Sequence, residues 1–321
     1  MDVVLLFPGQ GSQKPGMGKD LAEAFPAARA AFDTVDKALG FKLSDLCFSD
    51  SMAELTLTQN AQPALLAHGA AVWAVLSQED GIRVCAAGGH SLGEFTAYHA
   101  AGALSLAEAA QLVRRRGELM YKSGIERPGA MAAILGDPDL AVEAICERAS
   151  REAGLVVPAN YNCPGQVVIS GESAGVDRAM VLLKEAGAKR TIKLNVSGAF
   201  HSPLMSAAAP GLQTALNSVT FSGPRFPVYA NVDGLPVTDS RTAKTRLLDQ
   251  LSSPVRWTQE VTTMAAKYPD ALYLELGPGN VLGGLVKRIA PSVRTAACGT
   301  VSDVHQVKAL LVASVLGSEG T

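Results

Sequence analysis

Three short apolar segments, each followed by a glycine-rich turn and then by a helical pattern, restrict the fold of this chain most. The segments are residues 3–7, 84–87 and 271–276, and the turns are residues 8–16, 88–93 and 277–279. Apolar strands that alternate with helices are typical of parallel sheets buried on both faces. In such sheets the functional loops lie at the carboxyl ends of the strands, where all three turns fall. The sequence therefore predicts an α/β fold with a site near these turns.

The middle of the chain has a different order of elements. Strands are predicted at 130–135, 155–160, 166–170 and 190–196, and helices at 138–149 and 174–186. This β-α-β-β-α-β order is the ferredoxin-like pattern. We therefore expect a large α/β-hydrolase-like domain with a parallel sheet, formed by residues 1–127 and 198–321, and a small inserted ferredoxin-like α+β domain at 128–197. A cleft between the two is a natural place for a substrate.

Composition argues against several classes of protein. The net charge is −2 and aromatic residues make up 5% of the chain, so nothing points to nucleic acid. No stretch reaches about 18 apolar residues, and Pro8 and Gly9 interrupt the apolar start, so neither a membrane helix nor a signal peptide is expected. The five cysteines are scattered without zinc-site spacing, which predicts reduced thiols, no metal and a cytoplasmic location. The segment after residue 300 is expected to fray.

The sequence GHSLG at 89–93 is a G-x-S-x-G nucleophile elbow, with a strand before it and a helix after it. Its two glycines lack Cβ atoms, so a sharp turn can present the Ser91 hydroxyl. The start of the following helix offers free backbone N–H groups, which suit the oxyanion of a tetrahedral intermediate. A purely structural turn is the alternative, and the flanking elements favour a covalent nucleophile that carries an acyl group.

A serine nucleophile needs a base, and five histidines are candidates. His68 and His99 fall within expected helices and are interpreted as satisfied core or surface residues. His90 adjoins the serine, so its side chain should diverge from it, and His305 stands near the C-terminus without other polar groups of a site. His201 remains, in the loop after the last strand of the small domain. Spacing alone leaves its role as the base open.

Arg116 lies on the apolar face of a helix expected at 105–121, four residues from both Leu112 and Met120. Arg114 and Arg115 point elsewhere and are expected to be solvated. A buried arginine needs a partner, because an unpaired buried charge is costly. Helical periodicity alone favours a salt bridge to an internal carboxylate over a bidentate clamp for a substrate carboxylate, and leaves both open.

The first glycine-rich turn, FPGQGSQ at 7–13, does not carry a nucleotide motif. The third glycine of G-x-G-x-x-G is missing and Lys14 stands in its place, and the turn is not a Walker A loop. A turn that brings backbone N–H groups to the site is the better interpretation, and Gln10 could then supply a second oxyanion donor.

Together these pieces resemble the malonyl-CoA:acyl-carrier-protein transacylases of fatty-acid and polyketide synthesis, over residues from about 3 to about 290. The motifs that carry the resemblance are FPGQGSQ at 7–13, GHSLGE at 89–94, Arg116-Gly117, GAMAAILG at 129–136, NYNCPGQVVISG at 160–171, GAFHSPLM at 198–205, QLSSPVRW at 250–257 and LELGPGNVLGGL at 274–285. So many ordered motifs make the match specific.

The resemblance implies a role for each matching residue. Ser91 is the acylated nucleophile, and His201 is its base and then the acid for the leaving thiol. The backbone N–H groups of Gln10 and Leu92 form the oxyanion hole. Gln250 orients His201, largely through its backbone carbonyl.

Substrate choice follows from the same resemblance. Arg116 grips the malonyl carboxylate, and Phe200 crowds an α-substituent, so malonyl is favoured over methylmalonyl. A neutral acetyl group would leave the arginine unpaired. Phe95 and Cys163 depart from the common pattern, where tyrosine and serine are usual, and neither touches the implied chemistry.

The implied reaction is a ping-pong transfer from malonyl-CoA to the phosphopantetheine thiol of an acyl carrier protein. The CoA thioester is the substrate, and no bound cofactor is expected. An acidic carrier could dock on basic residues, and solvated faces are the alternative; the candidates are Lys184, Lys189, Arg190, Lys193, Lys287 and Arg288. A serine thioester hydrolase and a non-catalytic carrier-binding module are the competing readings, and the pathway, fatty-acid or polyketide, stays open.

Overall fold

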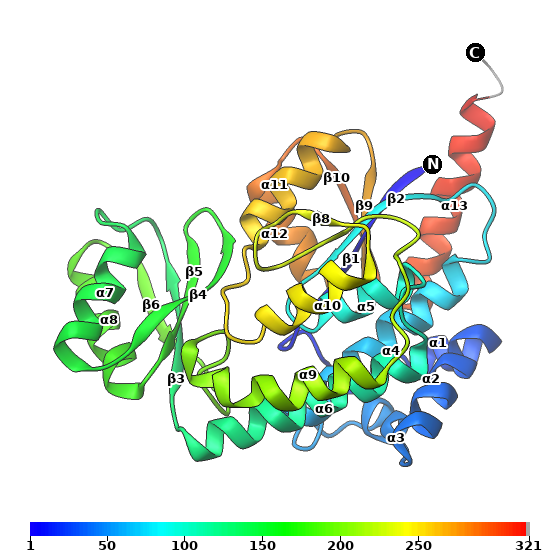
Figure 1. Cartoon of the computed structure of the whole chain (residues 1–321). Helices are drawn as coiled ribbons and strands as arrows, with labels where there is room; N and C mark the ends of the chain where they lie inside the picture. Colours follow the sequence, from blue (N-terminus) through cyan, green and yellow to red (C-terminus); the bar gives the residue numbers. More distant parts are fainter. Residues whose placement is uncertain (319–321) are drawn as a thin grey trace.

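The computed structural model describes residues 1–318 and contains two sheets, one beside the other (Figure 1). The larger has the order β10-β9-β1-β2-β7-β8. Its strands are β1 (Asp2–Phe7), β2 (Arg83–Gly89), β7 (Val228–Tyr229), β8 (Pro236–Val237), β9 (Leu272–Leu276) and β10 (Arg294–Cys298). Neighbouring strands are parallel from β10 to β7, and β8 pairs antiparallel with β7.

Helices cover both faces of the large sheet. They are α1 (Lys19–Ala24), α2 (Pro26–Leu39), α3 (Leu43–Phe48), α4 (Thr58–Leu76), α5 (Gly93–Ala100), α6 (Leu106–Glu126), the 3-10 helix η1 (Pro203–Ala208), α9 (Ala209–Ser218), α10 (Ser240–Asp249), α11 (Trp257–Lys267), α12 (Val281–Ile289) and α13 (Val301–Ser318). Val3 and Leu5 pack in one core with α2, α4 and α6, whereas Val4 and Leu6 pack in a second core with α11 and α12. Burial on both faces explains why β1 is a continuous apolar run.

The smaller sheet has the order β4-β5-β3-β6, and all its pairs are antiparallel. Its elements are β3 (Ala130–Leu135), α7 (Val142–Ala153), β4 (Val156–Cys163), β5 (Gln166–Gly171), α8 (Ser173–Glu185) and β6 (Arg190–Lys193). They enclose a separate hydrophobic core and form the green lobe in Figure 1. The predicted fold class, a parallel α/β sheet with a ferredoxin-like α+β unit, is confirmed.

Three predicted elements of this unit have clearly different bounds, since the strand expected at 155–160 continues to Cys163. The helix expected at 138–149 begins only at Val142, because the backbone of Asp139 is bonded to Ala186 in the loop before it. The strand expected at 190–196 ends at Lys193, and Leu194 and Val196 line a cavity instead.

The expectation that the chain frays after residue 300 is wrong for Val301–Ser318, which form α13. The helix start is well capped, since the Asp303 carboxylate accepts from the backbone N–H of Gly299 and Thr300. Val304 and Val307 are buried against the core. Residues 319–321 lie outside the described residues.

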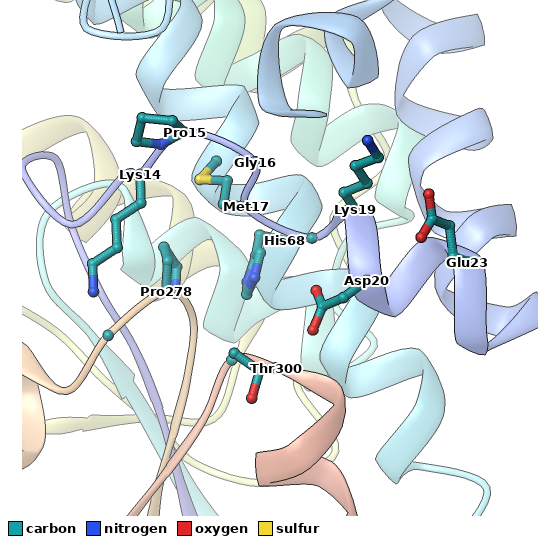
Figure 2. A pocket seen from close by; sticks show the side chains of 13 residues that line it. Lys14, Pro15, Gly16, Met17, Lys19, Asp20, Glu23, His68, Pro278 and Thr300 are labelled. Atoms are coloured by element: carbon teal, nitrogen blue, oxygen red, sulfur yellow. The ribbon is translucent and has the colours of Figure 1, made fainter. Parts of the chain in front are cut away.

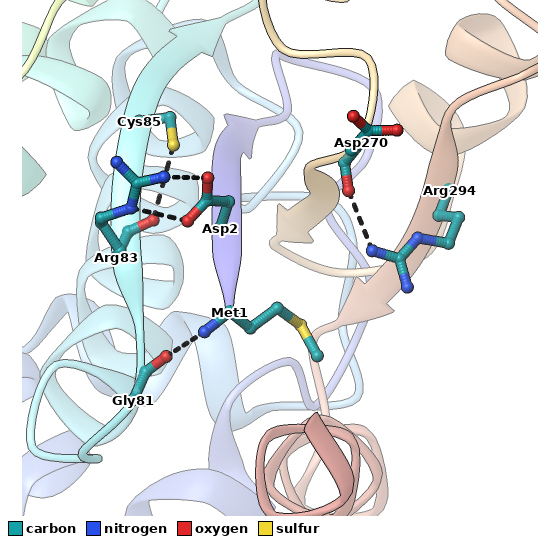
Figure 3. Close-up of polar contacts among 7 residues, drawn as sticks. All are labelled: Met1, Asp2, Gly81, Arg83, Cys85, Asp270 and Arg294. Carbon is teal, nitrogen blue, oxygen red and sulfur yellow. Dashed lines mark hydrogen bonds and ion pairs between the residues drawn. The ribbon is translucent and has the colours of Figure 1, made fainter. Parts of the chain in front are cut away.

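At the amino-terminal ends of the strands of the large sheet, polar contacts at the surface join neighbouring segments (Figure 3). The Arg83 guanidinium pairs with Asp2 and so joins β2 to β1, while Arg294 donates to the carbonyl of Asp270. Exposed pairs of this kind contribute little to stability, because solvent screens them. The hollows described next lie at the opposite, carboxyl edge.

Candidate active site

The turn between β2 and α5 holds Ser91 with a positive φ of 54°, which is unusual for a residue other than glycine. The two glycines of the motif make the turn possible. A Cβ at Gly89 would lie 2.1 Å from the backbone of Gly93, and one at Gly93 would lie 2.1 Å from the carbonyl of Phe7. The two glycines thus permit a sharp elbow that holds the serine out from the sheet.

His201 lies directly against this serine, with its Nε2 2.8 Å from Ser91 Oγ. On the other side of the ring, Nδ1 lies 3.0 Å from the carbonyl of Gln250 and 3.2 Å from that of Ser253. Carbonyl oxygens only accept, so Nδ1 carries the hydrogen and Nε2 is left to accept the serine proton. Burial and the nearby charge of Arg116 lower the pKa of His201 to about 3, so the ring is neutral near pH 7.

Arg116 reaches the same serine from α6 and is 1% exposed. Its guanidinium donates to Gln62 Oε1 at 2.7 Å, to Ser91 Oγ at 3.0 Å and to Gln250 Oε1 at 2.9 Å. All three acceptors are neutral, and no carboxylate of the described residues forms an ion pair with it. The reading of Arg116 as half of an internal salt bridge is therefore wrong.

The neighbouring arginines differ from each other. Arg115 has 52% of its side chain exposed, as expected for a solvated residue. Arg114 does not, because its guanidinium donates to Asn60 Oδ1 and to the Gln59 carbonyl beside a pair with Glu118, and 26% of the side chain is exposed. The expectation of a solvated Arg114 is wrong, since it ties α6 to the start of α4.

Two residues with unbonded backbone N–H groups border the same space. Gln10 and Leu92 both line the cavity above the serine, and neither backbone N–H is bonded to another group of the described residues. The Gln10 side chain is held aside by a bond to Thr58 Oγ1 at 3.1 Å. An oxyanion hole requires two free N–H donors, and here one follows the end of β1 and the other follows the end of β2.

A cavity of about 120 Å³ encloses these groups at the junction of the two sheets. Its apolar walls are Met120, Met131, Leu194, Val196 and Phe200. Phe200 precedes His201 in the chain and is 6% exposed. The cavity has room for a short acyl group beside the serine.

The other histidines take no direct part in this arrangement. His90 bonds Asn162 through Nε2 at 2.9 Å, so its ring diverges from the serine as expected. His99 is bonded to the Leu104 carbonyl, and His305 lies edge-on to Phe25. His68 is buried, and neither ring nitrogen forms a hydrogen bond of ordinary geometry with the described residues, although the backbone of Gly299 is close enough to raise its pKa against the effect of burial.

A buried polar network beneath the elbow was not predicted. Asn231, in the loop after β7, accepts from the Ser91 N–H at 2.7 Å and donates to the Gly89 carbonyl at 2.8 Å and to Glu260 Oε2 at 2.9 Å. Gln250 Nε2 donates to Glu94 Oε2 at 2.7 Å and to the Ser91 carbonyl at 2.9 Å. Glu94 lies in the GHSLGE motif and could have been singled out, whereas no pattern marked Asn231 or Glu260.

A second and larger hollow, of about 430 Å³, opens at the ends of β1, β9 and β10 (Figure 2). It is lined by Lys14, Met17, Asp20, Pro278 and Thr300, with His68 at its base. It contains neither Ser91 nor Arg116. Size alone therefore does not identify the site.

Half of the basic residues expected to dock a carrier are engaged within the chain. Lys184 donates to two carbonyls, Lys193 pairs with Asp177, and Arg288 donates to Pro164. Lys189, Arg190 and Lys287 are exposed. In the part of the chain that the structure describes, no group of three His, Cys, Asp or Glu could hold a metal, and no helix is long and apolar enough to cross a membrane.

The fold and this geometry place the chain among the α/β proteins that hold a Ser–His pair on a nucleophile elbow. A family model for the acyl transferase domain matches residues 4–305. The chain belongs to this family.

Among its relatives, the malonyl CoA-acyl carrier protein transacylase of Bacillus subtilis is 45% identical over 306 residues, which cover 95% of each chain. A crystal structure of the acyl-carrier-protein-S-malonyltransferase from Bartonella henselae superposes with a TM-score of 0.91 at 41% identity, covering 97% of this chain and 99% of that one. A malonyl-transacylase in complex with its type II PKS acyl-carrier protein superposes with a TM-score of 0.90 at 38% identity, covering 95% and 98%.

Proposed function

We propose that this chain is a malonyl-CoA:acyl-carrier-protein transacylase. The observation that carries the proposal is the position of Arg116, whose guanidinium lies 3.0 Å from Ser91 Oγ in the cavity beside it. An acyl group attached to this serine and ending in a carboxylate has its counter-ion within reach. A Ser–His pair alone would suit any acyl group.

In the first half-reaction Ser91 Oγ attacks the thioester carbonyl of malonyl-CoA while His201 Nε2 takes the serine proton. The developing oxyanion accepts from the N–H groups of Gln10 and Leu92. The C–S bond then breaks, His201 returns its proton to the departing CoA thiolate, and a malonyl ester remains on Ser91. The carbonyls of Gln250 and Ser253 stabilise the charged imidazole in place of an acidic third residue.

The second half-reaction reverses these steps with a different thiol. His201 removes the proton from the phosphopantetheine thiol of the carrier, and the sulfur attacks the ester. Collapse of the intermediate transfers the malonyl group to sulfur and returns the proton to Ser91 Oγ. Thioester exchange of this kind is nearly isoenergetic, so the reaction needs no bound cofactor and no metal. Exclusion of water from the small cavity protects the ester from hydrolysis.

Phe200 narrows the cavity beside the serine, so we assign it the selection of malonyl over methylmalonyl. Acetyl-CoA should be a poor substrate because it leaves Arg116 without an anion. We also propose that residues 128–197 form the inserted domain and that 1–127 with 198–321 form the other, in keeping with their separate sheets and cores. The five free thiols fit a cytoplasmic enzyme.

The proposal is tested by mass spectrometry of the intact protein after brief mixing with malonyl-CoA. We expect a malonyl adduct on the native protein and none on Ser91→Ala. Holo-carrier protein should discharge the adduct and gain its mass. An adduct that water removes as fast as the carrier does would identify a thioester hydrolase instead, and absence of any adduct would leave a binding module.

A further inference from the structure

Arg116 is a buried cation without an adjacent anion. The side chain is 1% exposed, and its guanidinium donates only to the neutral acceptors Gln62, Ser91 and Gln250 among the described residues. A charge in such a place needs compensation, because desolvation of an unpaired ion is costly. A counter-charge a short distance away would supply this compensation.

Gln250 connects Arg116 to one. Its Oε1 accepts from Arg116 at 2.9 Å, and its Nε2 donates to Glu94 Oε2 at 2.7 Å. The amide thus faces a cation with its oxygen and a carboxylate with its nitrogen, which fixes its orientation. Glu94 is fully buried on α5; its Oε2 also accepts from the Asn231 N–H, whereas its Oε1 has no partner among the described residues.

We propose that Glu94 is the resident counter-charge of Arg116, and that the carboxylate of an incoming malonyl group takes over this function while Glu94 binds one proton from solvent at Oε1. The inference rests on the proposed function. Before malonyl binds, the Glu94 anion balances the Arg116 cation. The malonyl carboxylate adds a second anion, and protonation of Glu94 restores the balance.

The surroundings of Glu94 favour this exchange. The titratable groups around it are Arg116 from α6, Asp233 from the loop after β7, Glu260 from α11, whose pKa burial raises well above its ordinary value, and Tyr98 on the same helix. Burial raises the pKa of Glu94 to about 7, although hydrogen bonds from Asn231 and Gln250 and the charge of Arg116 oppose the rise. A malonyl carboxylate at Arg116 cancels the effect of that cation, so the carboxyl gains its proton near neutral pH.

Calorimetric titration of malonyl-CoA into Ser91→Ala, in two buffers with different heats of ionisation, measures the protons taken up on binding. At pH 7.5 a carboxyl with a pKa of about 7 is already protonated in about a quarter of the molecules, so we expect uptake of about 0.5 to 0.75 proton per site. Acetyl-CoA, which lacks the carboxylate, serves as the control ligand. Uptake that is the same for both ligands overturns the proposal.

Two further variants in the Ser91→Ala background identify the group that is protonated. Glu94→Gln should reduce the uptake to near zero. Glu260→Gln is the matched control, because this carboxyl is equally buried but bonded to Asn231 instead of Gln250, and uptake should persist. Uptake that survives Glu94→Gln places the proton on another group, such as His201, and the proposal is then wrong.

Affinity gives an independent measurement. At pH 8 Glu94→Gln should bind malonyl-CoA about tenfold more tightly than its parent, and at pH 6 equally, because only the parent must take up a proton. If the variant does not fold, the parent alone suffices, since its malonyl-CoA Kd should rise with pH relative to that for acetyl-CoA. Equal Kd values at pH 8, or a flat ratio, overturn the proposal. A native protein that forms no malonyl-Ser91 adduct would instead refute the proposed function.

Discussion

Two hollows at the carboxyl edge of the large sheet each contain a buried histidine, and the two histidines differ in their partners. His201 is 4% exposed, and its two ring nitrogens contact a hydroxyl and two carbonyls. His68 is 1% exposed, and its nitrogens form no hydrogen bond of ordinary geometry with the described residues; the Gly299 backbone is its one near polar neighbour that acts on its pKa as a hydrogen-bond partner. The hollow beside His68 is the larger, at about 430 Å³ against about 120 Å³. Hydrogen bonds that converge on one side chain therefore identify the active site better than the volume of a hollow does.

Burial lowers the pKa of both imidazoles, to about 3 for His201 and about 4 for His68. Both are therefore neutral near pH 7, and charge does not separate them. The two histidines differ in their partners. The carbonyls of Gln250 and Ser253 fix the tautomer of His201, and its Nε2 therefore faces the hydroxyl group of Ser91. A neutral imidazole becomes a base only when such a donor is in place.

Substitution of His201 should give the largest effect. We expect His201→Ala to slow malonyl-adduct formation about 10³- to 10⁴-fold, because the serine loses its proton acceptor. Rapid-quench mass spectrometry measures this rate. His68→Ala should keep the rate within about twofold of the native value. If His201→Ala and His68→Ala slowed acylation to a similar extent, the distinction between a catalytic and a non-catalytic histidine would be wrong.

Arg116 supplies the next largest effect. Arg116→Gln should lower kcat/KM for malonyl-CoA about 100-fold, since a charge-assisted bidentate contact is lost, and should barely affect acetyl-CoA. Arg115→Gln, on the exposed side of the same helix, is the matched control and should leave both substrates unchanged. An equal loss for both substrates after Arg116→Gln would show that the arginine supports the elbow and does not select the acyl group.

Asn231 should matter less but still measurably. Asn231→Ala frees the Ser91 N–H and the Gly89 carbonyl, which relaxes the strained elbow, and we expect about a tenfold slower acylation with little change in KM. Asn60→Ala is the matched control: this asparagine is also buried and bonded, but to Glu54 and Arg114. An unchanged acylation rate would mean that the two glycines hold the turn without help.

Sequence patterns predicted the parts of this molecule that depend on local constraints. Short apolar runs before glycine-rich turns identified β1, β2 and β9, and the helical face that carries Arg116 is buried as its periodicity indicated. β7 and β8 escaped prediction because strands of two residues are too short for any periodicity. β10 was missed as well, since its short sequence RTAAC is not a continuous apolar run and only its last residue is buried.

The polar network was missed for a related reason. Asn231 follows one of those two-residue strands, and Glu260 lies on α11 far along the chain from the elbow. Both act through contacts that exist only once β7 pairs with β2. The elbow, in contrast, is specified within five consecutive residues and could be read directly.

The smallest expected effect concerns stability and tests His68 directly. In the native chain its pKa is lowered from 6.5 to about 4 by burial, so the unfolded state binds the proton more readily between these values. The imidazole therefore lowers the free energy of unfolding as the pH falls through this window. His68→Leu should stabilise the protein by about 1 kcal/mol at pH 8, where only the unpaired polar group is removed. The gain should grow by up to about 3 kcal/mol as the pH approaches 4.

Urea unfolding of both proteins at several pH values measures this difference, and the contribution of His201 cancels because both proteins contain it. His99→Leu is the contrasting variant, since His99 is bonded to the Leu104 carbonyl and its loss should destabilise. If His68→Leu destabilises at every pH, the imidazole has a partner that matters in solution. The larger hollow would then contain a hydrogen-bond partner for His68, and His68 and His201 would differ only in how strongly each imidazole is bonded.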